Sequence, residues 1–163
     1  MKVFWNTCIQ SLKLPRREAV FALNRIGMDI VVIYMFLLLA IASIPGLVEQ
    51  ILSNSNNADS QLHTFFLLIF FFIFYYLIIV VIVFGLLSII AYIGTLIAKV
   101  IGRKLQFGLM WKMTAFATTI PLLAFTILSF FIPLTTIFIL IASGFILYLL
   151  IRIMLIYPKR KQR

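Results

Sequence analysis

The stretch FFLLIFFFIFYYLIIVVIVFGLLSIIAYIGTLIA (residues 65–98) contains no Asp, Glu, Lys or Arg and decides the fold. A helix needs about 20 consecutive apolar residues to cross a hydrocarbon core of roughly 30 Å. At about 1.5 Å per residue, this stretch makes a helix of about 51 Å, which is more than one crossing requires. A break at Gly85 would leave a second arm too short to span the membrane. The sequence therefore predicts one long transmembrane helix over 64–98, tilted or projecting at its C-terminal end.

Two other stretches, 30–48 and 113–151, are also free of these four charged residue types. The first predicts a transmembrane helix over 29–48, with Pro45 near its far end, where a kink or a helix end costs little. The second is too long for one crossing, and Pro133 predicts a turn between helices over 113–131 and 134–157. Pro121 falls inside the former helix and predicts a kink. The expected fold is all-α, with four transmembrane helices.

The basic residues give this bundle an expected orientation. The 14 Lys and Arg outnumber the four Asp and Glu and leave a net charge of +10. All of them fall in the segment before the first span (1–28), in the loop 99–112, or from Arg152 into the tail 158–163. The opposite loop, 49–63, has none. Because Lys and Arg in short loops mark the cytoplasmic side, we expect both termini in the cytoplasm.

The N-terminal 28 residues predict two short helices at the membrane surface. Phe4, Trp5 and Cys8 recur at helical spacing with Ile9 and Leu12, which is typical of an amphipathic helix lying in the interface. Pro15 ends this helix and can open the next one.

Arg25 and Asp29 stand four residues apart at the entrance of the first span, so we expect a structural ion pair on one helical face. The alternative for Asp29 is an ion or proton site. A proton relay normally needs a chain of ionisable groups inside the spans, and the spans contain no second one.

Basic residues interleaved with aromatic ones can indicate nucleic-acid binding, but here they adjoin membrane spans. We therefore expect contact with anionic lipid headgroups and no nucleic-acid partner. The residues expected to make headgroup contact are Lys2, Trp5, Lys13, Arg16, Arg17, Arg103, Lys104, Trp111, Lys112, Lys159, Arg160 and Lys161.

Small residues predict where the helices touch. Helices in lipid associate through close backbone approach, because lipid tails are as apolar as the side chains. A stripe of small residues at spacings of three and four runs along the long helix. It consists of Gly85, Ser88, Ala91, Thr95 and Ala98.

The residues that carry chemistry are few and scattered. Cys8 is the only cysteine, which excludes an intrachain disulfide and a multi-cysteine metal site. The single histidine, His63, has Asp59 nearby, and one histidine with one acid makes a poor metal site. Because no nucleophile stands with a positioned base, we expect a protein that is not an enzyme and has no metal or cofactor.

The opening of the chain contains FW (4–5), SLKLP (11–15), LNRIGMD (23–29) and IP (44–45). With these elements, residues 4–51 resemble the start of the domain of unknown function 1189 family of bacterial membrane proteins. Further on, LIAKVIGRKLQFGLMWKMTAFATTIPLL (96–123) is similar in layout to Yip-type membrane proteins. The chain departs from the first family in its shorter extracytoplasmic segment. The resemblance implies a helical bundle in a bacterial plasma membrane and supplies no catalytic residues.

Two functions remain open at this point. The first is a non-enzymatic scaffold, assembly factor or regulatory subunit whose basic surface meets anionic lipid, a membrane-protein partner or a second copy. The second is a small transporter or channel component with a pathway near Pro121, formed by Thr118, Thr119 and Ser143. A polar cavity between the spans would favour transport, whereas a closed apolar bundle would favour the scaffold.

Overall fold

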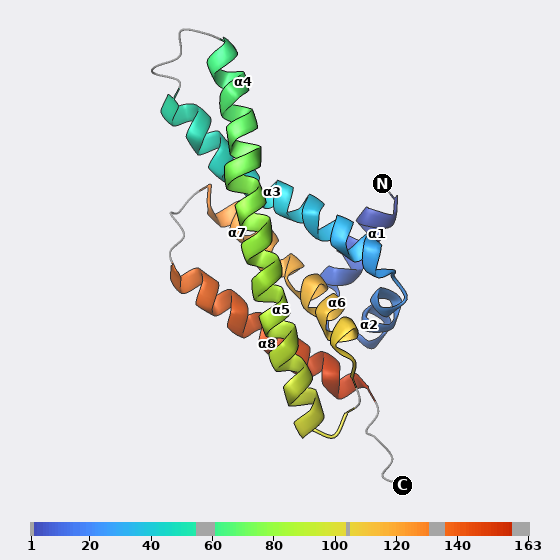
Figure 1. The fold of residues 1–163 in the computed structure, drawn as a ribbon. Helices are drawn as coiled ribbons and strands as arrows, with labels where there is room; N and C mark the ends of the chain where they lie inside the picture. Colours follow the sequence, from blue (N-terminus) through green and yellow to red (C-terminus); the bar gives the residue numbers. More distant parts are fainter. Residues whose placement is uncertain (1, 55–60, 104, 131–135, 158–163) are drawn as a thin grey trace.

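A computed structural model describes residues 2–54, 61–103, 105–130 and 136–157, and every regular element in these ranges is helical (Figure 1). The elements are α1 (Lys2–Leu12), α2 (Arg17–Asn24), α3 (Met28–Asn54), α4 (Gln61–Phe70), the π-helix η2 (Phe71–Tyr76), α5 (Leu77–Val100), α6 (Phe107–Ala117), α7 (Thr119–Leu128) and α8 (Thr136–Ile156).

Four helical segments are long and apolar enough to cross a membrane. They cover Met28–Leu52, Phe65–Val100, Phe107–Leu128 and Ile137–Ile156. The expectation of an all-α protein with four candidate spans is thereby confirmed. The third span differs most from its expected bounds, because it begins at Phe107 rather than at 113 and so shortens the basic loop.

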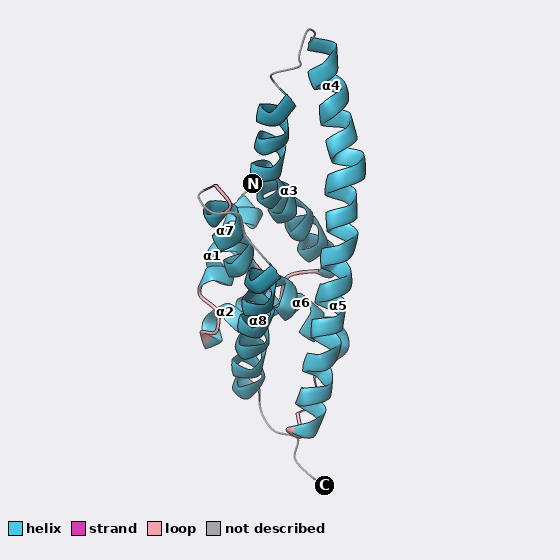
Figure 2. Cartoon of the chain, turned by 90° about the vertical axis from the view of Figure 1, so that its left-hand side faces the viewer, coloured by secondary structure: helices cyan, strands magenta, loops and turns pink. Residues whose placement is uncertain are grey.

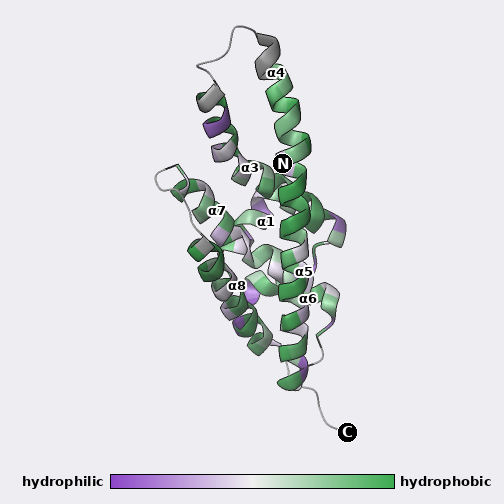
Figure 3. Ribbon diagram, turned by 60° about the vertical axis from the view of Figure 1, so that its left-hand side comes forward, coloured by the Kyte–Doolittle hydropathy of each residue, from purple (hydrophilic) through white to green (hydrophobic). Residues whose placement is uncertain are grey.

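The long second span consists of α4, η2 and α5, which follow one another without a break. Hydrophobic residues cover most of its length (Figure 3). It crosses the other spans at an angle, and α4 extends beyond α7 and α8 together with the far part of α3 (Figures 1 and 2). The single long helix is as expected, but the π-helical turn inside it is not. Such turns in α-helices are rare and are often found at functional sites.

The first span, α3, continues past Pro45 to Asn54 and bends part-way along its length (Figure 2). Proline removes one backbone hydrogen bond and crowds the preceding turn, which accounts for a bend without ending the helix. Next to Pro45, a Cβ atom added to Gly46 would lie 2.9 Å from the hydroxyl of Tyr75. The glycine therefore lets η2 approach α3 closely, and the Tyr76 hydroxyl donates a 2.8 Å hydrogen bond to the carbonyl of Phe36.

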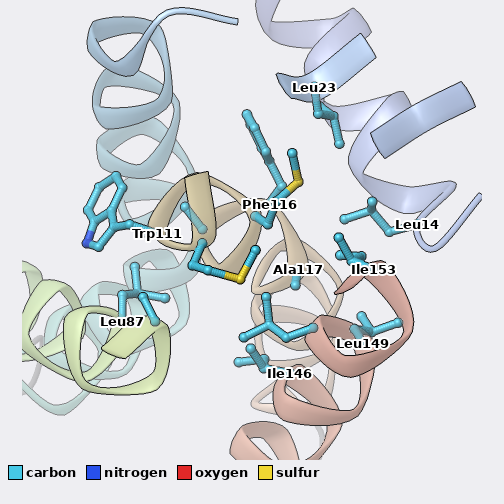
Figure 4. Close-up of a cluster of buried hydrophobic side chains, with 14 of the residues drawn as sticks. Leu14, Leu23, Leu87, Trp111, Phe116, Ala117, Ile146, Leu149 and Ile153 are labelled. Carbon is cyan, nitrogen blue, oxygen red and sulfur yellow. The ribbon is translucent and has the colours of Figure 1, made fainter. Parts of the chain in front are cut away.

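The third span forms the centre of the bundle. In its 18-residue apolar segment, 50% of the residues are buried, compared with 11% in the corresponding segment of the long span. Side chains from the other helices converge on α6 (Figure 4). The labelled residues of this core are Leu14, Leu23, Leu87, Trp111, Phe116, Ala117, Ile146, Leu149 and Ile153.

The contact between α5 and α8 uses small residues. Gly94, Ala91 and Ala98 are buried, and a Cβ added to Gly94 would lie 3.3 Å from the Met154 Cε atom. Gly85, in contrast, has open space where its Cβ would be. The predicted stripe is therefore buried from Ala91 to Ala98, whereas Gly85 has no close neighbour at its Cβ position.

The N-terminal helix α1 packs into the bundle. Thr7 and Ser11 are buried, whereas Trp5 and Leu12 are exposed. The Phe4 ring lies 5.2 Å from the ring of Tyr34 in α3. The prediction that the aromatic and aliphatic residues of α1 share one lipid-facing side is therefore wrong in part, because the small hydroxyl residues face the protein and allow close helix contact.

Candidate functional site

The short link between α5 and α6 positions Arg103. Gly102 adopts φ 77°, a left-handed conformation that glycine tolerates best, and ends α5. The amides of Gly102 and Arg103 donate to the carbonyls of Lys99 and Ala98, at 3.0 and 2.8 Å, in the pattern of a Schellman motif. The turn directs Arg103 to α8, where its Nη1 donates a 2.6 Å hydrogen bond to the carbonyl of Met154.

Arg103 thus occupies the C-terminal end of α8, where a positive charge is favoured by the helix dipole. Its side chain is only 9% exposed, and within the described part of the chain its Nε atom has no hydrogen-bond partner. The buried hydroxyl of nearby Tyr157 also lacks a partner there, and burial raises the pKa of this phenol above its usual value.

Lys112 makes the corresponding contact at the end of α2. Its Nζ donates to the carbonyls of Asn24 and Ile26, at 2.8 and 2.9 Å. These carbonyls lie at and just beyond the last turn of α2, where backbone acceptors lose their helical donors. A lysine from α6 therefore holds the connection between α2 and α3 against the bundle.

These contacts correct the headgroup prediction for the α5–α6 region. Trp111 is buried and donates from Nε1 to the Ser88 hydroxyl at 3.2 Å, so it does not face lipid headgroups. Arg103 is buried as well and donates to the carbonyl of Met154. Lys112 is partly exposed, so its contact with headgroups stays a prediction beside its bonds to backbone carbonyls.

The other residues expected at headgroups divide into two sets. Trp5, Lys13, Arg16 and Arg17 are exposed on or near α1 and α2. The positions of Lys104, Lys159, Arg160 and Lys161, and the side chain of Lys2, lie outside what the structure describes. The turn at Pro133 and the loop residue Asp59 also lie outside the described residues, as does the side chain of His63.

The ion pair between Arg25 and Asp29 does not form. Both side chains are exposed, and no ion pair joins them. The reason is local structure, because α2 ends at Asn24 and α3 begins at Met28, so the two residues do not share a helical face. Asp29 instead occupies the first turn of α3, where a carboxylate favours the positive end of the helix dipole.

A partly enclosed cavity of about 320 Å³ lies between all four spans. Its buried wall includes Ala42 and Ser43 from α3, Leu87 from α5, Thr118 before α7 and Ile146 from α8. Exposed side chains also line it on η2, α5 and α8. These are Tyr75, Ile82, Leu86 and Ile139. The cavity therefore opens between α5 and α8, towards the surface that faces lipid.

The cavity contains the residues that the sequence suggested for a pathway, with one exception. Thr118, Pro121 and Ser143 line it, whereas Thr119 is buried elsewhere and shares a 2.8 Å hydrogen bond with the Tyr34 hydroxyl. The hydroxyls of Ser43, Thr118 and Ser143 donate to carbonyls of their own helices, at 2.7 to 2.9 Å. Their donors are occupied, so the cavity presents a mainly apolar surface.

Sequence reasoning missed most of this cavity. Ala42, Leu87 and Ile146 look like any other apolar residues in a span, and only the proline and the hydroxyl residues of the third and fourth spans stood out. Among the described residues, no group of three or more His, Cys, Asp and Glu could hold a metal ion.

Three apolar candidate spans around a more buried third span define a multi-pass helical membrane protein. The model of a family described as protein of unknown function (DUF1189) matches residues 47–157, and the chain belongs to this family. The match begins after the FW, SLKLP, LNRIGMD and IP motifs and covers the remaining spans. This family match does not support the similarity to Yip-type proteins. Comparison with curated proteins and with solved structures gives no match.

Proposed function

We propose that the protein is a non-enzymatic membrane scaffold, assembly factor or regulatory subunit that acts through a basic platform. The platform comprises six exposed basic residues in the link between α1 and α2, at the two ends of α2, and in the C-terminal parts of α5 and α8. They are Lys13, Arg16, Arg17, Arg25, Lys99 and Arg152. The observation that carries the proposal is the pair of contacts from Lys112 and Arg103, which fix α2 and the end of α8 to the bundle. A fixed array of positive charge suits a binding surface.

The positive charge of the platform indicates an acidic partner. Juxtamembrane Lys and Arg are attracted to anionic headgroups and to acidic protein surfaces. We place the platform in the cytoplasm of a bacterial cell, with both termini on the cytoplasmic side of the plasma membrane. The reason is that the loop 49–63, on the opposite side, has no Lys or Arg.

Photo-crosslinking from position 13 in native membranes tests the scaffold. We expect a discrete protein adduct whose yield falls several-fold when Arg16→Glu and Arg17→Glu are combined, because charge reversal repels an acidic partner. The matched control, Arg16→Lys with Arg17→Lys, should keep the adduct. Equal yields in both double variants, or adducts to lipid alone, would contradict the scaffold.

Thiol labelling tests the orientation. In a Cys8→Ser background, a membrane-impermeant maleimide added outside intact cells should label Asn54→Cys. It should reach Arg16→Cys only after the membrane is permeabilised. The opposite pattern would overturn the proposed orientation.

The alternative of a small transporter or channel component has one supporting observation, the position of Thr118, Pro121 and Ser143 around the cavity. Ion flux into liposomes that disappears in Ser143→Val would favour this alternative. We prefer the scaffold because the cavity hydroxyls already donate to backbone carbonyls.

A further inference from the structure

We propose that the cavity between the four spans is a binding site for one hydrocarbon chain of a membrane lipid, which enters between α5 and α8. This site is separate from the basic platform and does not depend on the scaffold role.

The shape of the cavity is the first argument. At about 320 Å³ it lies within the usual range of ligand pockets, roughly 300–1,000 Å³. Its wall is built from all four spans, and Leu87 and Ile146 are 2% and 4% exposed. A chain that reaches these two side chains has left the annular lipid layer and lies inside the protein.

The chemistry of the wall is the second argument. Most lining side chains are aliphatic or aromatic, and the hydroxyls of Ser43, Thr118 and Ser143 donate to their own helices. Water needs two to four polar partners to occupy a cavity, and ions need ligands that replace their hydration. This wall offers few such groups, whereas hydrocarbon requires none.

The position of the opening is the third argument. The exposed residues Ile82, Leu86 and Ile139 flank the mouth on helices that are candidate membrane spans. The mouth therefore faces acyl chains at high local concentration. An empty apolar void would also leave its lining atoms without dispersion contacts, which an inserted chain restores.

Ala142 provides a way to fill the site. It lines the cavity from α8, and its neighbour Ile141 is exposed and is not part of the lining. Ala142→Phe adds an aromatic ring where the chain would lie, and Ile141→Phe adds one on the lipid-facing side of the same helix. Both variants introduce phenylalanine into α8. Ala142→Phe changes the side that lines the cavity, and Ile141→Phe changes the exposed side.

The experiment uses the full chain reconstituted with phosphatidylglycerol that has a diazirine near the middle of one acyl chain. After illumination, we expect crosslinks at the buried wall, at Leu87 or Ile146, in addition to those on exposed residues. The wall crosslinks should fall at least tenfold in Ala142→Phe and persist in Ile141→Phe. They should also diminish when unlabelled phosphatidylglycerol is added in excess.

Crosslinks restricted to exposed residues in the unmodified chain would overturn the proposal, as would wall crosslinks that survive Ala142→Phe. If Ala142→Phe fails the circular-dichroism check of its helical content, Ser143→Leu fills the same cavity from the next position. Wall labelling by a diazirine-bearing alkane with no headgroup, but none by the lipid, would assign the cavity to a different apolar ligand and also count against the proposal.

Discussion

Replacement of Phe116 by alanine is expected to lower the free energy of unfolding by about 3 kcal/mol, the low end of the range for deleting a buried phenylalanine. The Phe116 side chain has 0% exposure, and its ring lies 5.8 Å from the ring of Tyr34. In a membrane the unfolded chain also meets hydrocarbon, so the transfer part of the cost is small. The cavity and the lost packing contacts remain, because α6 is surrounded by other helices and cannot collapse around the deletion.

Unfolding in mixed micelles, titrated with a denaturing detergent and followed by circular dichroism, measures this loss. Phe66→Ala is the matched control, since Phe66 is 65% exposed on α4 and its ring meets only its neighbour Phe65 among the described aromatic contacts. We expect it to change stability by less than about 0.5 kcal/mol. Equal losses for the two variants would contradict the placement of α6 at the centre of the bundle.

The spans could be predicted from the sequence because length and hydropathy are local properties. Residues 65–98 contain no charge and exceed one crossing, and the structure accordingly has a long helix there. The π-helical turn at Phe71–Tyr76 could not be predicted in this way. Its residues Tyr75 and Tyr76 contact Gly46 and Phe36 of another span, and such long-range contacts leave no local pattern in the sequence.

The roles of polar and basic residues were harder to predict, because their partners lie far away in the sequence. Trp111 looked like an interfacial aromatic residue, yet it bonds to Ser88 and is buried. Arg103 looked like a headgroup contact, yet it bonds to Met154. Amphipathic spacing alone could not show that α1 turns Ser11 towards the bundle, since hydropathy ranks serine as polar.

The cavity could not be predicted for the same reason, because its wall combines residues that are far apart in the sequence. Each span contributes ordinary residues such as Ala42 or Ile146, and the space exists only where four helices fail to fill it. Pro121 was the one strong local signal, because a proline in a span interrupts regular packing. Its position in the cavity wall shows that this signal was informative, although the sequence could not give the volume or the opening.

Lys112 explains why the third span begins at Phe107 rather than after the lysine. A charge inside a span is expensive unless it is paired or reaches the interface. Here the ammonium group binds the carbonyls of Asn24 and Ile26, so α6 continues through it. The same bonds satisfy acceptors at the end of α2. One side chain therefore connects the span to the N-terminal helices that hold part of the basic platform.

Lys112→Met should release α2 from the bundle while the spans stay folded. Hydrogen bonds to charged groups contribute about 1.5–3 kcal/mol each, and we expect a net local loss of about 2 kcal/mol. That loss raises the open population about 30-fold, so trypsin should cleave near Arg17 and Arg25 about 30-fold faster when opening is in equilibrium. Lys99→Met is the matched control, because Lys99 is exposed and has no side-chain hydrogen bond within the described chain. Cleavage rates that match those of the unmodified protein would show that α2 is held by its apolar contacts alone.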